Sequence, residues 1–207
     1  MIRVFDEHAR EYDSWYLRQP FVFESEARAI EALRPTGLGL EVGVGTGVFA
    51  RRLEVGVGID PSLEMLQLAK SRGVQVVRAI AEHLPFREAF DFVLLAGTLC
   101  FVKEPNVTVR ETWKVLKDNG TLIVCEVPRD SAWGKLMEEK GRAGHRFYRH
   151  ARAYTTKEVR HMLESSGFKV VGATATLASG PEEPERPEEP SDNTEGRSFI
   201  CLRAVKT

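Results

Sequence analysis

Short apolar runs alternate with amphipathic segments along most of the chain. The runs are apolar nearly throughout, which is typical of strands that are buried on both faces. In the segments between them, apolar residues recur every three or four positions, which predicts helices. The expected strands span 38–42, 55–60, 74–80, 90–96, 121–127, 168–177 and 198–205, and the expected helices span 5–17, 21–33, 48–53, 62–72, 105–117 and 155–167.

Strands that alternate with helices through short connections indicate parallel strands joined by right-handed crossovers. The helices then cover both faces of the sheet. We therefore expect a doubly wound α/β fold. A length of 207 residues suits a single domain that buries about 70% of the surface of its unfolded chain.

Three glycines spaced two apart follow the first predicted strand, at Gly43, Gly45 and Gly47. Glycine adopts positive φ and has no Cβ, so this turn lets the backbone approach a ligand closely. The short helix that follows directs free N–H groups to the same place. A carboxylate directly before the turn, Glu41, would repel a pyrophosphate and attract an ammonium group.

A second carboxylate, Asp60, ends the next predicted strand, where such a residue typically accepts hydrogen bonds from ribose hydroxyls. A ligand with a ribose and an ammonium group but no phosphate is S-adenosylmethionine. The dinucleotide fingerprint G-x-G-x-x-G has a different spacing. An NAD-dependent oxidoreductase is therefore the least favoured interpretation.

Four ordered motifs between about 38 and 177 resemble class I, Rossmann-like methyltransferases, in particular the small-molecule "methyltransferase type 11" group. The motifs are E-x-G-x-G-x-G from Glu41, AEHLPF from Ala81, FDFVLL from Phe90 and WKVLKDNGTLIV from Trp113. The resemblance implies a seven-stranded, mostly parallel sheet of order 3-2-1-4-5-7-6 with its last strand antiparallel. It also implies an enzyme that uses S-adenosylmethionine and releases S-adenosylhomocysteine.

The resemblance places Glu41 at the methionine end of the cofactor, Asp60 at the ribose and Ala81 with Glu82 along the adenine. Ile80 stands where the family often has an Asp, so apolar contacts replace one hydrogen bond to adenine, at a cost of about 1 kcal/mol. The expected cofactor-binding residues are Glu41, Gly43, Val44, Gly45, Gly47, Asp60, Pro61, Ala81, Glu82 and Gly97.

Methyl transfer from a sulfonium requires positioning and a dry pocket more than a catalytic base. No catalytic residue is therefore assigned, and His145, Tyr148 and His150 are candidate bases only for a hydroxyl or amine acceptor. No metal site is expected. The candidate acceptor-binding residues are Tyr12, Trp15, Phe101 and Tyr148; for Tyr12, Trp15 and Phe101 ordinary packing is an equal alternative.

The resemblance divides the chain into an N-terminal helical cap (1–36), a cofactor-binding half (37–128), an insertion (129–154) and a C-terminal helix and hairpin (155–207). We expect the cap and the insertion to form the roof of the acceptor pocket. A loop at 178–197 has a proline at every third position from Pro181 to Pro190 among glutamates. The polyproline II period predicts a solvated, mobile spur on the sheet edge away from the cofactor.

The methyl acceptor is expected to be a small molecule. The basic segment 140–152 favours one alternative, an RNA or protein methyltransferase, although such a run is usually a solvated face. A non-catalytic S-adenosylmethionine-binding protein is the other alternative. The chain has 29 basic and 30 acidic residues, so its net charge calls for neither nucleic acid nor membrane. Oligomeric state is not readable from the sequence.

The N-terminus has no apolar targeting segment, and no apolar run approaches the length of a membrane span. These features predict a soluble, cytoplasmic protein. Three widely spaced cysteines, Cys100, Cys125 and Cys201, lie in or beside apolar runs without a C-x-x-C motif. We expect all three to be buried reduced thiols.

Overall fold

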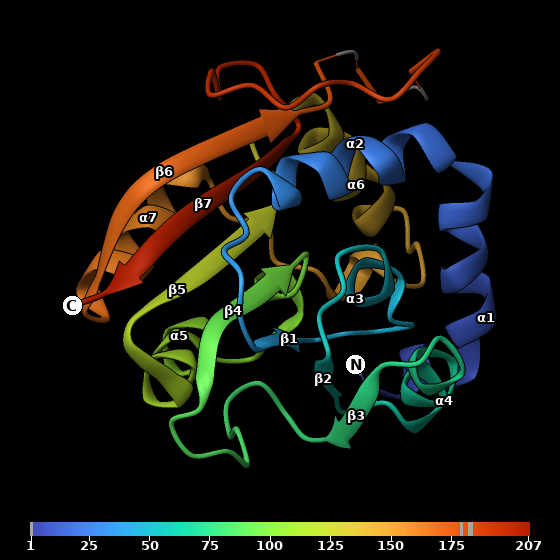
Figure 1. The fold of residues 1–207 in the computed structure, drawn as a ribbon. Helices are drawn as coiled ribbons and strands as arrows, with labels where there is room; N and C mark the ends of the chain where they lie inside the picture. The colour runs from blue at the N-terminus through green and yellow to red at the C-terminus, as the bar shows by residue number, and fades with distance from the viewer. Residues whose placement is uncertain (1, 179, 182–183) are drawn as a thin grey trace.

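The strands form one sheet in the computed structural model, which describes residues 2–178, 180–181 and 184–207. The sheet has seven strands in the order β3-β2-β1-β4-β5-β7-β6, and β7 runs antiparallel to both of its neighbours (Figure 1). The predicted fold class and strand order are confirmed. The strands are β1 (Gly39–Val42), β2 (Val57–Asp60), β3 (Gln75–Arg78), β4 (Phe90–Ala96), β5 (Leu116–Glu126), β6 (Phe168–Thr176) and β7 (Phe199–Lys206).

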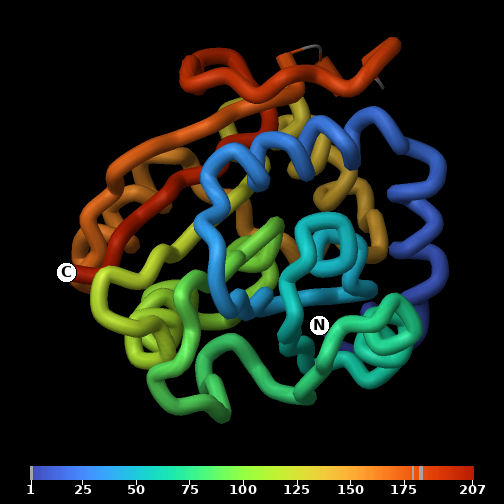
Figure 2. Tube along the Cα trace, in the orientation of Figure 1, coloured from blue at the N-terminus to red at the C-terminus, as the bar shows by residue number. Residues whose placement is uncertain are grey.

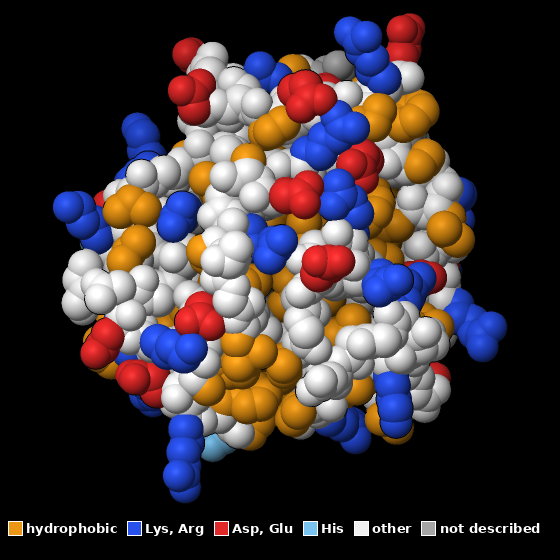
Figure 3. All heavy atoms as spheres, viewed as in Figure 1, with side chains coloured by type: hydrophobic (Ala, Val, Ile, Leu, Met, Phe, Trp, Pro, Cys, Tyr) orange, Lys and Arg blue, Asp and Glu red, His pale blue; other side chains and the backbone are white. Residues whose placement is uncertain are grey.

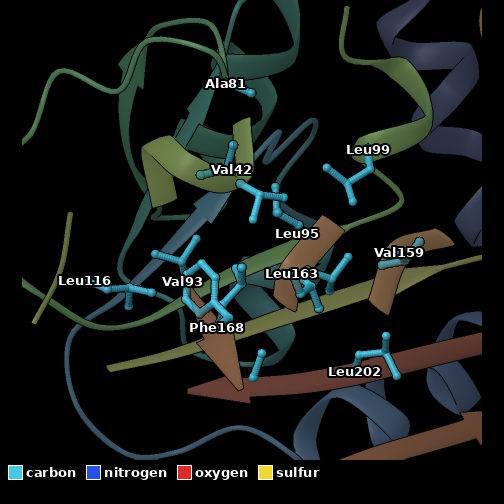
Figure 4. Packing of buried hydrophobic residues seen from close by; sticks show 14 of the residues in the cluster. Val42, Ala81, Val93, Leu95, Leu99, Leu116, Val159, Leu163, Phe168 and Leu202 are labelled. Atoms are coloured by element: carbon cyan, nitrogen blue, oxygen red, sulfur yellow. The ribbon is translucent and has the colours of Figure 1, made fainter. Parts of the chain in front are cut away.

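Helices cover both faces of this sheet. Phe92 and Leu94 of β4 face a layer that includes α2, α3 and α4, whereas Val93 and Leu95 face α5 and α7. Figure 4 shows this second layer, in which Val93 and Leu95 point toward Leu163. The helices are α1 (Ile2–Arg18), α2 (Pro20–Glu31), α3 (Val48–Arg52), α4 (Leu63–Ser71), α5 (Pro105–Val115), α6 (Ala132–Arg142) and α7 (Thr156–Ser165), with short 3-10 helices η1 (Leu99–Phe101) and η2 (Tyr148–His150).

Local signals in the sequence account for several helix ends. Pro20 separates α1 from α2, and Ser62 caps α4 by accepting a hydrogen bond from the Met65 amide. Thr155 and Glu158 form a capping box at the start of α7. Helix α6 was not predicted, because its apolar stripe is short (Trp133, Leu136 and Met137) and only Gly134 along its length is fully buried.

The expectation of three reduced cysteines is wrong. Cys125 of β5 and Cys201 of β7 lie directly opposite each other in the antiparallel pair and form a disulfide. Cys100 is a free, buried thiol as expected. Pairing depends on the register between two strands that are 76 residues apart, which the spacing of cysteines along the chain does not reveal.

The loop at 178–197, which the structure describes except for residues 179, 182 and 183, lies on the sheet edge as expected, but the expectation that it projects as a spur is wrong. The loop runs over α2 before the chain enters β7 (Figure 2). The Glu188 amide donates to the Ser25 hydroxyl at 2.8 Å, and Glu189 pairs with Arg28. Ser191 exchanges two backbone hydrogen bonds with Ala175, so the loop also covers the edge strand β6.

No helix in the described part of the chain is long and apolar enough to cross a membrane.

Candidate active site

The three glycines of the turn after β1 all adopt positive φ, between +52° and +78°. A Cβ on Gly47 would lie 2.9 Å from the Ala69 backbone, so this glycine is required for packing against α4. A Cβ on Gly45 would meet nothing within 4 Å, and the same holds for Gly97 after β4. Open space therefore lies over the turn on the side where a ligand is expected.

Backbone N–H groups of this turn are already used within the protein. The amides of Gly43 and Val44 both donate to the Ile59 carbonyl, at 2.9 and 2.8 Å. The Gly45 amide donates to the Asp60 carboxylate at 3.1 Å. These bonds join the turn to the end of β2, so the turn is held in place before any ligand binds.

The Asp60 carboxylate joins several segments at this end of the sheet through hydrogen bonds. Its second oxygen accepts a hydrogen bond from the Ser62 amide at 2.9 Å, and each carboxylate oxygen keeps one further lone pair. Burial raises its pKa to about 6, against the two backbone hydrogen bonds. The Ser62 hydroxyl donates to Asp6 of α1 at 2.7 Å, so the first helix reaches this point too.

Glu41 is buried beside the turn, and one of its oxygens, Oε2, has no hydrogen-bond partner among the described residues. Burial raises its pKa well above the ordinary range, and the neighbouring Asp60 adds to the rise. A buried, unsatisfied carboxylate oxygen is costly unless a ligand supplies the missing donor. An ammonium group of the ligand would supply it.

The residues predicted along adenine take different roles. Ala81 is buried, while Ile80 and Leu63 remain 46% and 48% exposed beyond the ends of β3 and β2, where they offer an apolar surface. The Glu82 carboxylate accepts hydrogen bonds from the backbone amides of Lys103 and Glu104, which fixes the segment directly before α5. The Pro61 carbonyl accepts from Arg78 at 2.9 Å.

A cavity of about 440 Å³ lies beside the glycine turn. Gly97 lines it, and the next residue, Thr98, donates to the Val42 carbonyl and would be touched by a Cβ on Gly43. The cavity and the turn are therefore neighbours, joined through the segment after β4. The cavity brings together the predicted acceptor residues Tyr12, Trp15, Phe101 and Tyr148 and the candidate base His145.

Helix α1 forms one wall of this cavity and is fastened on both sides. Arg72, at the C-cap of α4, donates to Asp13 at 2.8 Å and to the Thr46 carbonyl at 2.8 Å, which ties α1 to the glycine turn. Arg146 donates to Glu11 at 2.6 Å, which ties α1 to the segment before η2. The ring of Phe5 contacts Phe101 and Phe147, at centroid distances of 5.2 and 5.5 Å. The cap and the insertion thus meet over the cavity.

Two of the three candidate bases lie at the cavity. His145 stacks on Tyr148 at 4.4 Å, and burial and nearby Lys140 lower its pKa. Burial raises the pKa of Tyr148. His150 is not among the lining residues, and its Nε2 accepts a hydrogen bond from Arg149 at 3.1 Å. The structure therefore separates His150 from the cavity.

Two buried carboxylates in the cavity wall were missed by the sequence analysis. Glu26 of α2 is 7% exposed, and no hydrogen bond to its carboxylate is recorded among the described residues. Burial raises its pKa to about 8. Glu126 ends β5 and accepts the Leu99 amide at 2.8 Å, and burial raises its pKa to about 7.

Each missed carboxylate has a signal in the sequence. Glu26 lies between Val22 and Ile30 at i, i+4 spacing, which places a charged residue inside the apolar stripe of α2. Glu126 stands at the carboxyl end of a parallel strand, the edge where open α/β sheets bind their ligands.

The sheet order and the glycine turn define a class I, Rossmann-like methyltransferase fold. A family model described as a methyltransferase domain matches residues 40–124. An uncharacterized protein of Methanocaldococcus jannaschii is 38% identical over 206 residues, which cover 99% of this chain and 100% of that protein. Since a solved SAM-dependent methyltransferase from Thermotoga maritima is 36% identical over 100% of both chains, this chain belongs to the S-adenosylmethionine-dependent methyltransferase family.

Two further relatives carry functional names. A solved structure from Thermotoga maritima, described as a SAM-dependent methyltransferase and possible histamine N-methyltransferase, is 36% identical with a TM-score of 0.96 over 100% of both chains. A demethylmenaquinone methyltransferase from a Mycobacterium species is 31% identical over 147 residues, which cover 66% of this chain and 64% of that protein. The two names differ in the acceptor, so they do not identify the acceptor of this chain.

Proposed function

We propose that the chain binds S-adenosylmethionine at the glycine turn and transfers its methyl group to a small molecule held in the adjoining cavity. The carrying observation is the position of this cavity, which is lined by Gly97 and reaches the turn through Thr98. Aromatic rings make up much of its wall. A pocket of about 440 Å³ lined by aromatic side chains suits a small acceptor.

The residues present fit the cofactor. The unsatisfied Oε2 of Glu41 would accept a hydrogen bond from the ammonium group, and the free lone pairs of Asp60 would accept the ribose hydroxyls. The exposed side chains of Leu63 and Ile80 would contact adenine. The open space over Gly45 admits the ligand.

When bound, S-adenosylmethionine supplies a methyl group on a positively charged sulfur, which is a good leaving group. The chain's own residues then mainly orient the acceptor and exclude water. Phe5, Phe101 and Phe147 pack together between α1, η1 and the insertion, and this cluster closes one side of the cavity against solvent. A water-excluding wall protects a reactive methyl donor from side reactions.

The alternative of an RNA or protein acceptor depends on free basic side chains in 140–152. Arg142 pairs with Glu138, and Arg146 pairs with Glu11. On the face seen in Figure 3, Lys and Arg side chains are interspersed with Asp and Glu. Two of the five basic side chains of 140–152 are therefore paired with acids, which weakens the case for an RNA or protein acceptor. The open cavity beside Gly97 likewise favours an enzyme over a non-catalytic binding protein. A cytoplasmic location stays a prediction from the sequence.

Calorimetry with S-adenosylhomocysteine tests the proposed cofactor site. We expect one binding event, and no heat from NAD. Asp60→Ala should weaken binding more than about tenfold, because hydrogen bonds to a charged group are worth about 1.5–3 kcal/mol. Asp118→Ala, which removes an exposed carboxylate from the far end of the sheet, is the matched control and should bind normally. Binding of NAD in place of S-adenosylhomocysteine would refute the proposal.

A further inference from the structure

The acceptor cavity has an unusual distribution of charge. Two buried carboxylates, Glu26 and Glu126, line the cavity. The three arginines that also line it are exposed to solvent. Each arginine already has a partner: Arg18 donates to Ser14, Arg129 pairs with Glu158, and Arg152 lies over the Tyr154 ring. Among the described residues no cationic side chain forms an ion pair with Glu26, and burial alone acts on its pKa.

Glu26 shares the cavity with aromatic side chains. Burial raises the pKa of Tyr12, Tyr16 and Tyr148, and the charge of Glu26 adds to the rise for each of them. All three tyrosines line the same cavity as Glu26. A carboxylate among aromatic faces is the arrangement that proteins use to bind organic cations, since the ring faces attract positive charge and the carboxylate pairs with it.

An unpartnered buried carboxylate is also a liability for the chain on its own. Transfer of an ionised carboxylate into an apolar wall costs several kcal/mol unless a partner compensates. Glu26 occupies a position where an apolar residue would continue the stripe from Val22 to Ile30. A ligand that carries a cationic group would supply the missing partner and would explain why a carboxylate stands at this position.

We propose that the methyl acceptor is a small organic amine, bound as its ammonium ion to the Glu26 carboxylate between the rings of Tyr12, Tyr16 and Tyr148. This inference rests on the proposed function and adds the chemical class of the acceptor. The amine must be small enough for a cavity of about 440 Å³, and its apolar body contacts the remaining aromatic wall. A neutral or anionic acceptor would leave Glu26 unpaired.

The chemistry balances without a further reactant. The ammonium ion first gives one proton to a carboxylate of the cavity, which frees the nitrogen lone pair. The lone pair forms the new N–C bond while the C–S bond breaks and its electron pair stays on sulfur. The product is the methylated ammonium ion, and the proton held by the carboxylate leaves to solvent after release.

Ligand discrimination tests this inference without any turnover. The probes are 2-phenylethylamine and n-hexylamine as cations, 2-phenylethanol as the neutral match and 3-phenylpropanoate as the anion. Each is titrated calorimetrically into the chain saturated with S-adenosylhomocysteine. We expect 2-phenylethylamine to bind at least about tenfold more tightly than 2-phenylethanol, and 3-phenylpropanoate to give no heat.

Glu26→Gln should reduce the preference for the amine to less than about threefold while leaving the affinity for S-adenosylhomocysteine within about twofold. Glu31→Gln, which changes an exposed carboxylate at the end of the same helix, should keep the preference. A second readout is the release of protons on amine binding, compared between wild type and Glu26→Gln. Amine binding near pH 7 should release protons to buffer, because Glu26 must ionise to pair with the ammonium ion.

The groups that face Glu26 do not obscure this proton release. Tyr12 and Tyr16 of α1 and Tyr148 of η2 stay neutral near pH 7, since burial raises the pKa of each. Glu126 on β5 also lines the cavity and titrates near this pH, whereas burial and the nearby Lys140 lower the pKa of His145 below its ordinary value. Comparison with Glu26→Gln isolates the proton that belongs to Glu26.

Equal affinity for 2-phenylethanol and 2-phenylethylamine would overturn the inference. Preference for the anion, failure of both amines to bind, or an amine preference that survives in Glu26→Gln would overturn it equally. If S-adenosylhomocysteine itself does not bind, the proposed function fails. If it binds and the amine preference is absent, only the class of acceptor is wrong.

Discussion

Replacing Glu26 with Gln should stabilise the ligand-free chain at alkaline pH and change its stability little at acid pH. The Glu26 carboxyl is buried without a partner, and burial raises its pKa from 4.5 to about 8. Between these two values the folded chain keeps a proton that the unfolded chain has lost. The folded state therefore binds more protons, and its stability falls as pH rises through this window.

The size of the effect follows from the same pKa values. One pKa unit corresponds to 1.36 kcal/mol, so wild type should lose about 3 kcal/mol through Glu26 between pH 5 and pH 8. Gln is neutral throughout and loses nothing. For a chain of this length about 1 kcal/mol shifts the melting temperature by roughly 2–4 °C, so the two proteins should differ by about 6–12 °C more at pH 8 than at pH 5.

Urea denaturation followed by circular dichroism at pH 5, 6, 7 and 8 measures this difference. Wild type, Glu26→Gln and Glu31→Gln are compared without ligand. Other buried acids, including Asp60 and Glu126, titrate in all three proteins, so they cancel in the difference. A difference in free energy of unfolding that stays constant from pH 5 to pH 8 would refute the burial of an unpartnered Glu26.

Two further predictions concern the segments around the cavity. Arg72→Ala removes the bonds from α4 to Asp13 and the Thr46 carbonyl, so amide exchange in 2–18 should speed up by about tenfold or more while exchange in 90–96 stays unchanged; equal exchange in both proteins would show that these bonds do not hold α1. Replacing 180–196 with a short Gly-Ser turn removes the contacts of Glu188, Glu189 and Ser191, so the melting temperature should fall by roughly 5–10 °C, and an unchanged value would mean that the loop contributes no stability.

The sequence predicted the sheet well because its signals are local and repeated. Each buried strand is a short apolar run, and the order of the motifs around Glu41, Ala81 and Trp113 resembles one family closely enough to imply the strand order. The ends of several helices and strands lie a few residues from their predicted positions. Leu116, for example, begins β5 by pairing with Phe90 ahead of a bulge, whereas the pattern assigned it to the end of a helix.

The features that the sequence did not predict all depend on contacts between distant segments. The Cys125–Cys201 disulfide depends on strand register, and the fold of the proline-rich loop depends on Ser25 and Arg28 of α2. Whether Glu26 lines the cavity depends on which face of α2 meets the cavity. Its spacing within the α2 stripe was visible, but a single glutamate in an apolar stripe does not indicate whether it faces a pocket or solvent.

The most direct test of the account is a crystal structure of the chain with S-adenosylhomocysteine. We expect the ribose hydroxyls on Asp60, the amino group on Glu41 and the sulfur at the Gly97 side of the cavity, with the space between Glu26 and Glu126 open to it. A ligand bound elsewhere, or a sulfur separated from this cavity by a closed wall, would contradict the proposal that the glycine turn and the aromatic cavity form one active site.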